Sequence, residues 1–268
     1  MKPGTVILAL VALLSLAPFW LLLENALKAH AAIVADPLSF PFHPDWRNFV
    51  SAWRDGRFGH ALLNSVLLCA TSVCVTVTFS ALAAYPLARG TAPRGQAILL
   101  YFLCSVTVPI QIFLFPLFFL FARLGLIGNV FATGIVLAAI NLPLAILLLR
   151  ASVAAIPRGL DDAAFMDGAG PWRCFFFVIL PLMRPGLVTV ATVTWLASWN
   201  EFLITSTFQQ GDDNFTMTLA YRAMNGTLSV DQGLLMAGAL IILLPVIFLF
   251  LAVQRLFVEG MTAGSVKG

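Results

Sequence analysis

The residues whose side chains are best suited to bind a solute form a short aromatic and polar cluster at the end of an apolar stretch. Trp195 and Trp199 stand four residues apart, so a helix would place both indoles on one face. Asn200 and Glu201 follow directly. Glu201 is the ionisable residue that lies most clearly within an apolar stretch, where a charge is costly and usually functional. Aromatic faces with amide and carboxylate groups are what a site for a polar, sugar-like solute would use.

Two other interpretations of this cluster remain open. Trp is enriched at membrane interfaces, and Glu201 stands near the end of its stretch, within reach of water. Asn141, beside Pro143 in another apolar stretch, either lines the same path or hydrogen-bonds a neighbouring helix. Direct solute contact and a structural or gating role therefore both stay open. The candidates for a translocation path or gate are Asn141, Trp195, Trp199, Asn200 and Glu201.

These residues require helices that cross a membrane to position them. The chain has 268 residues, of which 60% are hydrophobic and 10% are charged, a composition that excludes an ordinary soluble domain. A spanning helix needs about 20 mainly apolar residues. The stretches that meet this requirement are 4–23, 61–88, 97–121, 129–150, 184–206 and 233–256. We therefore expect an all-α membrane protein with six transmembrane helices in a single domain, residues 1–268.

The orientation follows from the ends of the chain and from its charges. The apolar run from Thr5 to Leu23 is too long for the apolar core of a cleaved signal peptide, and Lys2 is the only charge before it. With six spans, more Lys and Arg fall on the side that holds both termini, as the positive-inside rule requires. Both termini are therefore expected in the cytoplasm.

A compact polar segment, residues 157–181, interrupts the apolar stretches on this predicted cytoplasmic side. Pro157 should end the fourth spanning helix, because proline disfavours helix at the preceding residue. A short helix is expected over residues 160–167, with two aspartates in its first turn, where negative charge suits the helix dipole. Gly168 suits the left-handed position that ends such a helix.

A second short helix should follow within the same segment. Pro171 suits its first position. Trp172 and the run 175–177 would lie on or in the membrane interface, and Leu180-Pro181 should break the chain before the next span. The residue types alone leave two interpretations open. The small pair Ala163-Ala164 would let a soluble partner approach closely, or the segment is an ordinary amphipathic connector.

The spacing within this segment resembles the EAA signature of permeases from binding-protein-dependent ABC importers. That family pattern is Glu-Ala-Ala, three residues, Gly, nine residues, Ile, one residue and Leu-Pro. The matching positions here are Asp162-Ala163-Ala164, Gly168, Val178 and Leu180-Pro181. The chain departs from the pattern at Asp162, which replaces Glu, and at Val178, which replaces Ile.

The resemblance extends over nearly the whole chain, to the MalG-type branch, which comprises permeases of carbohydrate-uptake ABC importers. It is carried by Ala83-Ala84-Tyr85 with Arg89, by Met166-Asp167-Gly168-Ala169 and by Trp199-Asn200-Glu201-Phe202. The resemblance implies the MetI-like permease fold, in which a short cytoplasmic coupling helix sits in a cleft of an ATPase. The residues that it assigns to ATPase coupling are Asp162, Ala163, Ala164, Asp167, Gly168, Leu180 and Pro181.

The same resemblance implies a set of partners in a bacterial cytoplasmic membrane. They are a second, homologous permease of the MalF type, a cytoplasmic ATPase dimer, an extracytoplasmic solute-binding protein and membrane lipid, with no nucleic acid. The chain contains no Gly-x-x-x-x-Gly-Lys-Ser/Thr phosphate loop. ATP and Mg are therefore expected on the partner ATPase, with no cofactor in this chain. The solute would be a sugar or sugar-like molecule, or alternatively another polar solute such as a glycerol-phosphate compound.

Rival classes find less support in the residues. An intramembrane enzyme needs reactive groups that converge at membrane depth, whereas His30, His43 and His60 all fall between the first two apolar stretches. A stand-alone carrier would not need the cytoplasmic docking signature. The four cysteines, Cys69, Cys74, Cys104 and Cys174, show no spacing of a metal site or disulfide framework. We therefore expect a transport subunit with no catalytic residue and no metal site.

Overall fold

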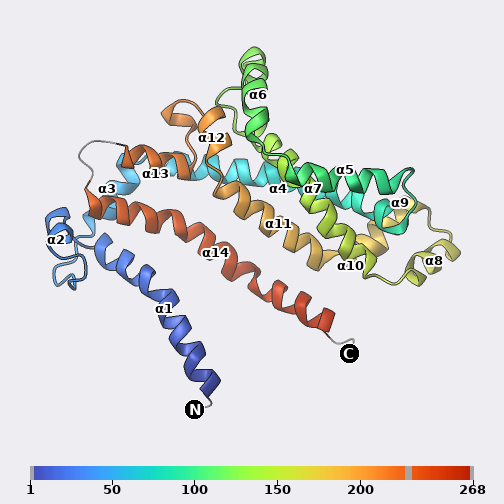
Figure 1. The fold of residues 1–268 in the computed structure, drawn as a ribbon, viewed down its shortest axis with the longest axis horizontal. Helices are drawn as coiled ribbons and strands as arrows, with labels where there is room; N and C mark the ends of the chain where they lie inside the picture. Colours follow the sequence, from blue (N-terminus) through green and yellow to red (C-terminus); the bar gives the residue numbers. More distant parts are fainter. Residues whose placement is uncertain (1–2, 227–230, 266–268) are drawn as a thin grey trace. The chain divides into compact units, whose positions relative to one another are not determined.

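The computed structural model describes the backbone of residues 3–226 and 231–265, and the side chains of residues 4–226 and 231–254. Every regular element within those residues is helical (Figure 1), which confirms the expected all-α class. The α-helices are α1 Pro3–Ala26, α2 His30–Ala35, α3 Arg47–Asp55, α4 Phe58–Arg89, α5 Gly95–Thr107, α6 Gln111–Leu124, α7 Val130–Ala154, α8 Gly159–Met166, α9 Pro171–Arg173, α10 Leu180–Leu182, α11 Arg184–Trp199, α12 Leu203–Phe208, α13 Met217–Asn225 and α14 Gln232–Ser265. A π-helix, Cys174–Ile179, joins α9 to α10, and a short 3-10 helix covers Asp212–Asn214.

Within the described residues, four helices are long and apolar enough to cross a membrane. They are Gly4–Ala26, Phe58–Arg89, Val130–Ala154 and Gln232–Gln254. Two further segments pass the same test only as bent pairs: α5 with α6, and Pro171–Leu182 with α11. Counting each pair as one span gives up to six candidate spans. The first, second, fourth and sixth apolar stretches of the sequence thus form continuous helices, as expected.

The stretch expected as a third straight span, residues 97–121, is instead two helices that meet at an angle of 93°. The break lies between Thr107 and Gln111, around Pro109. Proline lacks an N–H group and pushes the residue before it out of the helical region. Val108 accordingly has φ −77° and ψ 121°, which is extended backbone. A hydropathy window detects the apolar length of this segment but not its bend.

The fifth expected span, residues 184–206, also differs from a continuous helix. Helix α11 ends at Trp199, and α12 begins only at Leu203. The expected break at Leu180-Pro181 is wrong as well, because these residues form α10 and the chain turns at Met183, with a bend of 74°. The wider π-helical turns end at Ile179, two residues before Pro181, whose missing N–H cannot bond to the preceding turn.

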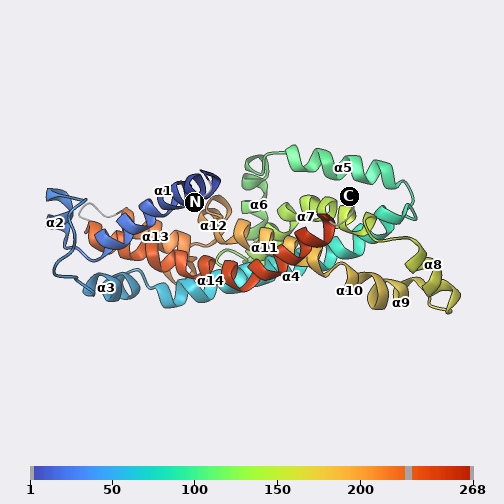
Figure 2. The same cartoon turned by 90° about the horizontal axis from the view of Figure 1, so that it is seen from below.

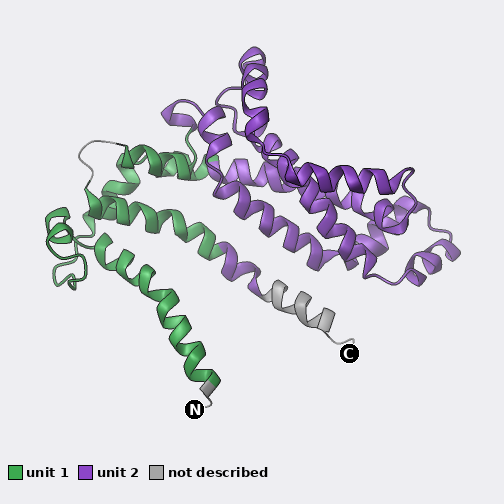
Figure 3. Cartoon of the chain, in the orientation of Figure 1, with its two compact units in different colours: residues 1–64, 215–248 green, residues 65–214, 249–268 purple. Residues whose placement is uncertain are grey.

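The chain forms two compact units, which are coloured separately in Figure 3. Unit 1 comprises Met1–Asn64 and Phe215–Phe248, and unit 2 comprises Ser65–Asn214 and Leu249–Gly268. In unit 1, the amide of Asn48 on α3 donates hydrogen bonds to the carbonyl oxygens of Ala26 and Lys28, each at 2.9 Å. Carbonyls at a helix end lack partners within the helix, so Asn48 secures the end of α1 to α3.

In unit 2, the spans pack on one another and on the short helices of the polar segment (Figures 1 and 2). One apolar cluster holds buried residues from α4, α7, α8, the π-helix and α11; its members are Ala81, Ala84, Ala145, Leu149, Val153, Ala164, Cys174, Phe175, Ile179, Met183 and Val190. Buried hydroxyls pair across helices as well: Ser198 on α11 donates to Ser72 on α4 at 2.9 Å. Such pairs hold helices together where lipid supplies no hydrophobic driving force.

Gly134 lies where α7 packs tightly against α4, and this contact generates a stability prediction. A Cβ atom at this position would lie 2.8 Å from Cβ of Thr71 and 3.0 Å from the carbonyl oxygen of Leu68. We expect Gly134→Ala to lower the free energy of unfolding by about 1–3 kcal/mol through overpacking, measured by thermal unfolding in detergent. Gly4→Ala is the control, because a Cβ at Gly4 meets nothing within 4 Å. Equal melting temperatures of the two variants would contradict the close packing of α4 and α7.

Candidate functional site

The polar segment begins where the long helix α7 ends. Helix α7 stops at Ala154, and α8 starts at Gly159, beyond Pro157. Asp161 and Asp162 occupy the first turn of α8, as the sequence predicts. There they lie near the partial positive charge of the helix N-terminus. The expected short helix and its charge pattern are thus present within one residue of the predicted bounds.

The turn after α8 also agrees with the sequence expectation. Gly168 has φ +78°, a left-handed conformation that favours glycine. A Cβ at Gly168 would meet nothing within 4 Å, so the backbone conformation rather than lack of space calls for glycine. Gly170 and Pro171 then begin α9, with proline in its first turn. The segment is therefore two short helical pieces joined by a glycine turn.

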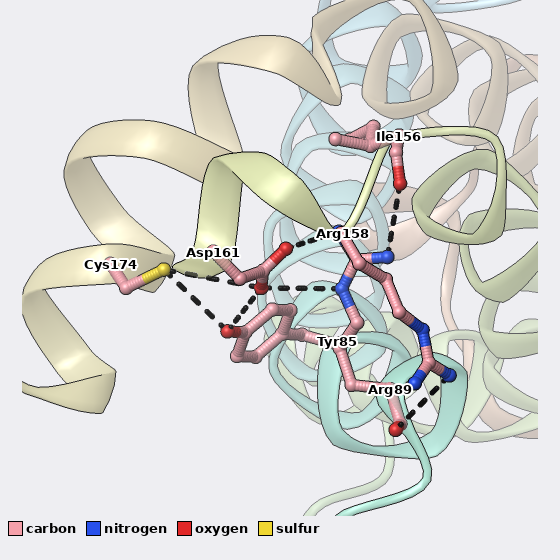
Figure 4. Close-up of polar contacts among 6 residues, drawn as sticks. All are labelled: Tyr85, Arg89, Ile156, Arg158, Asp161 and Cys174. Carbon is pink, nitrogen blue, oxygen red and sulfur yellow. Dashed lines mark hydrogen bonds and ion pairs between the residues drawn. The ribbon is translucent and has the colours of Figure 1, made fainter. Parts of the chain in front are cut away.

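A buried ion pair anchors α8 to the end of α4 (Figure 4). Nη2 of Arg89 lies 2.6 Å from Oδ2 of Asp161, and only 8% of each side chain is exposed. Nε of Arg89 donates a second bond to Oδ1 of Asp161 at 3.2 Å. The guanidinium thus meets the carboxylate through two contacts, an ion pair at Oδ2 and a hydrogen bond at Oδ1, which together fix the orientation of the two side chains.

Three further residues, Tyr85, Ile156 and Cys174, make polar contacts in and around this ion pair (Figure 4). The hydroxyl of Tyr85, one turn before Arg89, donates to Oδ1 of Asp161 at 2.8 Å. Nη1 of Arg89 donates to the carbonyl oxygen of Ile156, in the linker after α7, at 3.0 Å. The thiol of Cys174, in the π-helix, lies 3.6 Å from the Tyr85 hydroxyl. We call Tyr85, Arg89, Ile156, Asp161 and Cys174 the Asp161 cluster.

The Asp161 cluster determines which side of α8 faces away from the protein. Asp161 and Ala164, three residues apart, are buried. Asp162, Ala163 and Asp167 are exposed, and so are the apolar side chains Leu160, Phe165 and Met166, the last at 88%. Helix α8 therefore has one face bonded into unit 2 and one open face with small, apolar and acidic side chains.

The structure divides the residues that the family signature assigns to coupling. Asp162, Ala163, Asp167 and Gly168 are exposed, whereas Ala164 lies in the core. Leu180 is half-buried and Pro181 is exposed at the far end of the segment, in α10. Sequence reasoning missed the role of Asp161, the aspartate immediately before the signature, and of its partners on α4. The i, i+4 spacing of Tyr85 and Arg89 indicates a shared helix face, but no local pattern connects that face with Asp161.

The two neighbouring aspartates of α8 generate a matched pair of substitutions. Asp161→Asn leaves the Arg89 guanidinium buried without its counter-charge, so we expect the free energy of unfolding to fall by about 3–5 kcal/mol. Asp162→Asn changes an exposed side chain in the same turn and should stay within about 0.5 kcal/mol. Denaturant or thermal unfolding in detergent measures both. Equal effects of the two substitutions would contradict the role assigned to the Asp161 cluster.

The aromatic and polar cluster at the end of α11 is also brought together. The indole rings of Trp195 and Trp199 stack with centroids 6.3 Å apart and an angle of 11° between their planes. Trp199 is buried and Trp195 half-buried. The amide of Asn200 donates to the carbonyl oxygen of Leu196 at 2.9 Å, which caps the end of α11. The shared helix face predicted from the sequence is therefore present.

Glu201 has a definite structural task at the start of α12, where its side chain caps the helix from the position just before the N-cap residue Phe202. Its two carboxylate oxygens accept the backbone N–H groups of Ile204 and Thr205, each at 2.9 Å. The first N–H groups of a helix lack partners within the helix, and a carboxylate there also suits the helix dipole. This side chain makes the restart of the helix after the break at residues 200–202 favourable.

Asn141 lies beside α11 in a shallow hollow between α7 and α11. Its amide donates to the carbonyl oxygen of Leu137 at 2.8 Å, within its own helix. The side chains that line the hollow are Asn141, Leu144, Ala145, Leu148, Val190, Val193 and Thr194. The polar groups of this lining are thus one amide and one hydroxyl in an otherwise apolar surface.

The capping role of Glu201 leads to a further prediction. Glu201→Ala removes both acceptors, and loss of a cap costs about 0.5–2 kcal/mol. We expect faster hydrogen exchange at the amides of Ile204 and Thr205 in this variant, measured by mass spectrometry or NMR in detergent. Glu201→Gln keeps one acceptor oxygen and should show a smaller acceleration. Unchanged exchange in Glu201→Ala would show that the carboxylate does not cap α12.

Among the described residues, no group of three or more His, Cys, Asp and Glu side chains is arranged to hold a metal ion. The four cysteines are free thiols; Cys69 and Cys174 are buried, and Cys74 and Cys104 are exposed.

Comparison with known proteins places these features in context. Residues 76–263 match the family described as the inner membrane component of binding-protein-dependent transport systems. The diacetylchitobiose uptake permease NgcG of Streptomyces coelicolor is 30% identical over 97% of this chain and 87% of its own length. The melibiose/raffinose/stachyose import permease MelC of Bacillus subtilis is 29% identical over 100% of this chain and 97% of its own. The crystal structure of a bacterial ABC transporter that imports the acidic polysaccharide alginate contains a chain with the same fold. That chain superposes on this one with a TM-score of 0.79 and is 21% identical to it in sequence, over 94% of each chain.

Proposed function

Because this chain belongs to the family of inner membrane components of binding-protein-dependent transport systems, we propose that it is the permease subunit of an ATP-driven sugar importer. In this role it moves a sugar or sugar-like solute from an extracytoplasmic binding protein into the cytoplasm. The chain is a transport component rather than an enzyme, and ATP hydrolysis takes place on a separate chain.

The observation that carries this proposal is the two-sided construction of α8. A helix held by a buried ion pair on one face, and open on the other, suits transmission of force from a docked partner. The open face carries Asp162, Ala163 and Asp167, and the turn at Gly168 follows it. Small side chains permit close approach, and exposed carboxylates give a partner's Arg or Lys side chains a counter-charge.

The partners in this proposal are those implied by the family to which the chain belongs, together with the ATP-binding motif that its sequence lacks. Since its sequence has no phosphate loop, a cytoplasmic ATPase dimer must bind ATP and Mg. A second, homologous permease of the MalF type would complete the pathway, and a solute-binding protein would deliver the solute at the opposite face. We place the protein in the bacterial cytoplasmic membrane, with both termini in the cytoplasm, and treat residues 1–268 as one permease domain.

The geometry supports a specific route for the coupling. Closure of the ATPase dimer would move α8, and the Asp161–Arg89 contact passes that movement to the end of α4. The bond from Arg89 to the carbonyl oxygen of Ile156 ties the linker after α7 to the same point. Two spans would therefore move together when α8 moves. The breaks at residues 108–110 and 200–202 supply places where the spans change direction.

The sugar-like nature of the solute is supported by the solutes named for NgcG and MelC, which are oligosaccharides. The residue types at the end of α11 agree with it, because stacked indoles offer the apolar faces that sugar rings pack against. We keep Asn141, Trp195, Trp199, Asn200 and Glu201 as proposed residues of the path or its gate. In this role Glu201 and Asn200 act by holding the break between α11 and α12.

A glycine pair in the turn after α8 tests the coupling role. Gly168→Val forces a β-branched residue into left-handed backbone, which costs at least about 1–2 kcal/mol. Since 1.4 kcal/mol corresponds to a factor of ten, we expect solute uptake by the assembled transporter in proteoliposomes to fall roughly tenfold or more. Basal ATP hydrolysis should persist.

Gly170→Val is the matched control for this experiment. Gly170 has φ −74° and ψ 169°, which any residue adopts, and a Cβ there meets nothing within 4 Å. Uptake should therefore stay near the unsubstituted level. Normal uptake by Gly168→Val, or equal losses in both variants, would contradict the proposed role of the turn.

Purification of the tagged protein in mild detergent tests the proposed partners directly. Mass spectrometry of the purified material should identify an ATPase and a second permease. Binding of radiolabelled sugars to the associated solute-binding protein would then identify the solute. A chain that purifies alone, even after cross-linking from a cysteine introduced at Ala163, would contradict the importer assignment.

A further inference from the structure

The second half of the polar segment has an exposed apolar face of its own. We call Trp172, Phe176, Phe177 and Leu182 the aromatic face; their exposed fractions are 68%, 48%, 77% and 47%. The opposite side of the same segment is buried, with Cys174 and Ile179 at 0% and Phe175 at 3%. The buried side fixes the rotation of the segment, so the aromatic face points outward as a defined surface.

Ring contacts connect this face to the interior of unit 2. Trp172 stacks on Phe176 with centroids 6.1 Å apart and an interplanar angle of 20°. Phe176 meets Phe175 edge-on at 5.0 Å, and Phe175 lies 5.5 Å from the ring of Tyr85. The aromatic face is therefore a preorganised surface that lies against the Asp161 cluster.

The position of the segment indicates what covers it. Residues 171–182 run into α11 across Met183, with a bend of 74°. When α11 is taken as the part of the fifth candidate span that crosses the bilayer, a segment that turns from it by this angle runs more nearly along the membrane plane than along the bilayer normal. Figures 1 and 2 show α8, α9 and α10 together at this end of unit 2.

The composition of the surface matches a lipid interface. Trp is the residue most typical of the headgroup region, where its apolar ring and its N–H group are both accommodated. Arg173 and Arg184 are exposed at the two ends of the segment, and arginine side chains near a membrane surface reach for lipid phosphates. No Asp or Glu lies between residues 168 and 200, so no acidic side chain of this segment opposes contact with anionic lipid.

We propose that the aromatic face docks into the bilayer interface on the α8 side of the membrane, with lipid as its partner. The ring of Phe177 enters the boundary between headgroups and acyl chains, and Arg173 and Arg184 bind lipid phosphates. Two surfaces of one segment thus have different partners. The α8 face, with Asp162 and Asp167, turns to a soluble protein, while the aromatic face holds the segment to the membrane.

This docking adds a mechanical element to the proposed importer, and only this consequence rests on the proposed function. A segment held at one end by lipid and pushed at the other end by a partner acts as a lever about the glycine turn. The Asp161 cluster, which lies between the two ends, then transfers the displacement to α4.

The test compares spin labels at two exposed positions of the segment. Cys74 and Cys104 are replaced by Ala, whereas Cys69 and Cys174 remain, because both are fully buried and escape labelling. A single cysteine is then introduced by Phe177→Cys or, as the matched control on α8, by Met166→Cys. The labelled chain is purified with its partner subunits and placed in nanodiscs of phosphatidylethanolamine and phosphatidylglycerol. EPR power saturation gives the accessibility of each label to oxygen, which enters lipid, and to a water-soluble nickel chelate.

We expect oxygen access to exceed nickel access at position 177 in the assembled transporter. At position 166, on the α8 face proposed to dock the ATPase, we expect nickel access to exceed oxygen access after the partner subunits are removed. Nickel access that exceeds oxygen access at position 177 would overturn the proposal. A label at position 177 that both reagents reach only after the partner subunits are removed would also overturn it, because that result makes the aromatic face a protein contact. Neither outcome depends on transport, so a failure here is distinct from a failure of the importer assignment.

A second measurement avoids labelling altogether. Brominated lipids quench the fluorescence of Trp side chains that contact them, so they should quench Trp172 in nanodiscs. The fluorescence lost on changing from ordinary to brominated lipid should therefore be smaller in Trp172→Phe than in the unsubstituted chain. A quenched component of unchanged size in Trp172→Phe would contradict the lipid contact. Trp199→Phe serves as the control, because the indole of Trp199 is buried in the protein.

Discussion

The ion pair between Arg89 and Asp161 is the contact on which the geometry of the polar segment depends. Each side chain is only 8% exposed, and an isolated charge at such a site would be strongly unfavourable. The pair is tolerated because the two charges face each other and because further hydrogen bonds reach them. Tyr85 and Nε of Arg89 donate to the Asp161 carboxylate, and Nη1 of Arg89 donates to the carbonyl oxygen of Ile156. That requirement brings the end of α4, the linker after α7 and the first turn of α8 to one point. A short helix with little core of its own thereby acquires a fixed orientation.

Once α8 is held in this way, the rest of the segment is determined by local backbone chemistry. Gly168 forms the turn after α8, Pro171 starts the next helix, and the π-helix leads into α10, which contains Pro181 and ends just before the bend at Met183. The consequence is a segment with three distinct sides. One side is bonded to the spans, one is acidic and open to water, and one is aromatic. A connector that only joined two spans would need none of this differentiation.

The breaks within the spans have a similar logic. Around Pro109 the helix cannot continue, and at residues 200–202 it stops and restarts with Glu201 as a cap. Each break leaves backbone groups that need partners, which carboxylate, amide and hydroxyl side chains provide. Polar residues in these apolar helices therefore mark the points where a helix breaks, as well as the surfaces where helices contact one another. For a protein proposed to alternate between two conformations, such points are where rigid helices are joined.

The sequence by itself determined the features that depend on neighbouring residues. Apolar length predicted the candidate spans, although not the bends of the third and fifth. Pro157 and Gly168 predicted the bounds of α8 to within a residue, and Pro171 predicted the first residue of α9. The signature around Asp162 predicted a coupling role for this segment, and the open face of α8 that the structure shows agrees with that prediction. Tertiary structure alone decided that Asp161, rather than Asp162, is buried against Arg89. Arg89 and Asp161 are 72 positions apart, and the sequence does not distinguish one of two adjacent aspartates from the other. It also decided that Glu201 caps α12, because that role exists only where the helix breaks. Local propensities act over a few residues, whereas the burial of a charge is settled by which distant groups arrive beside it.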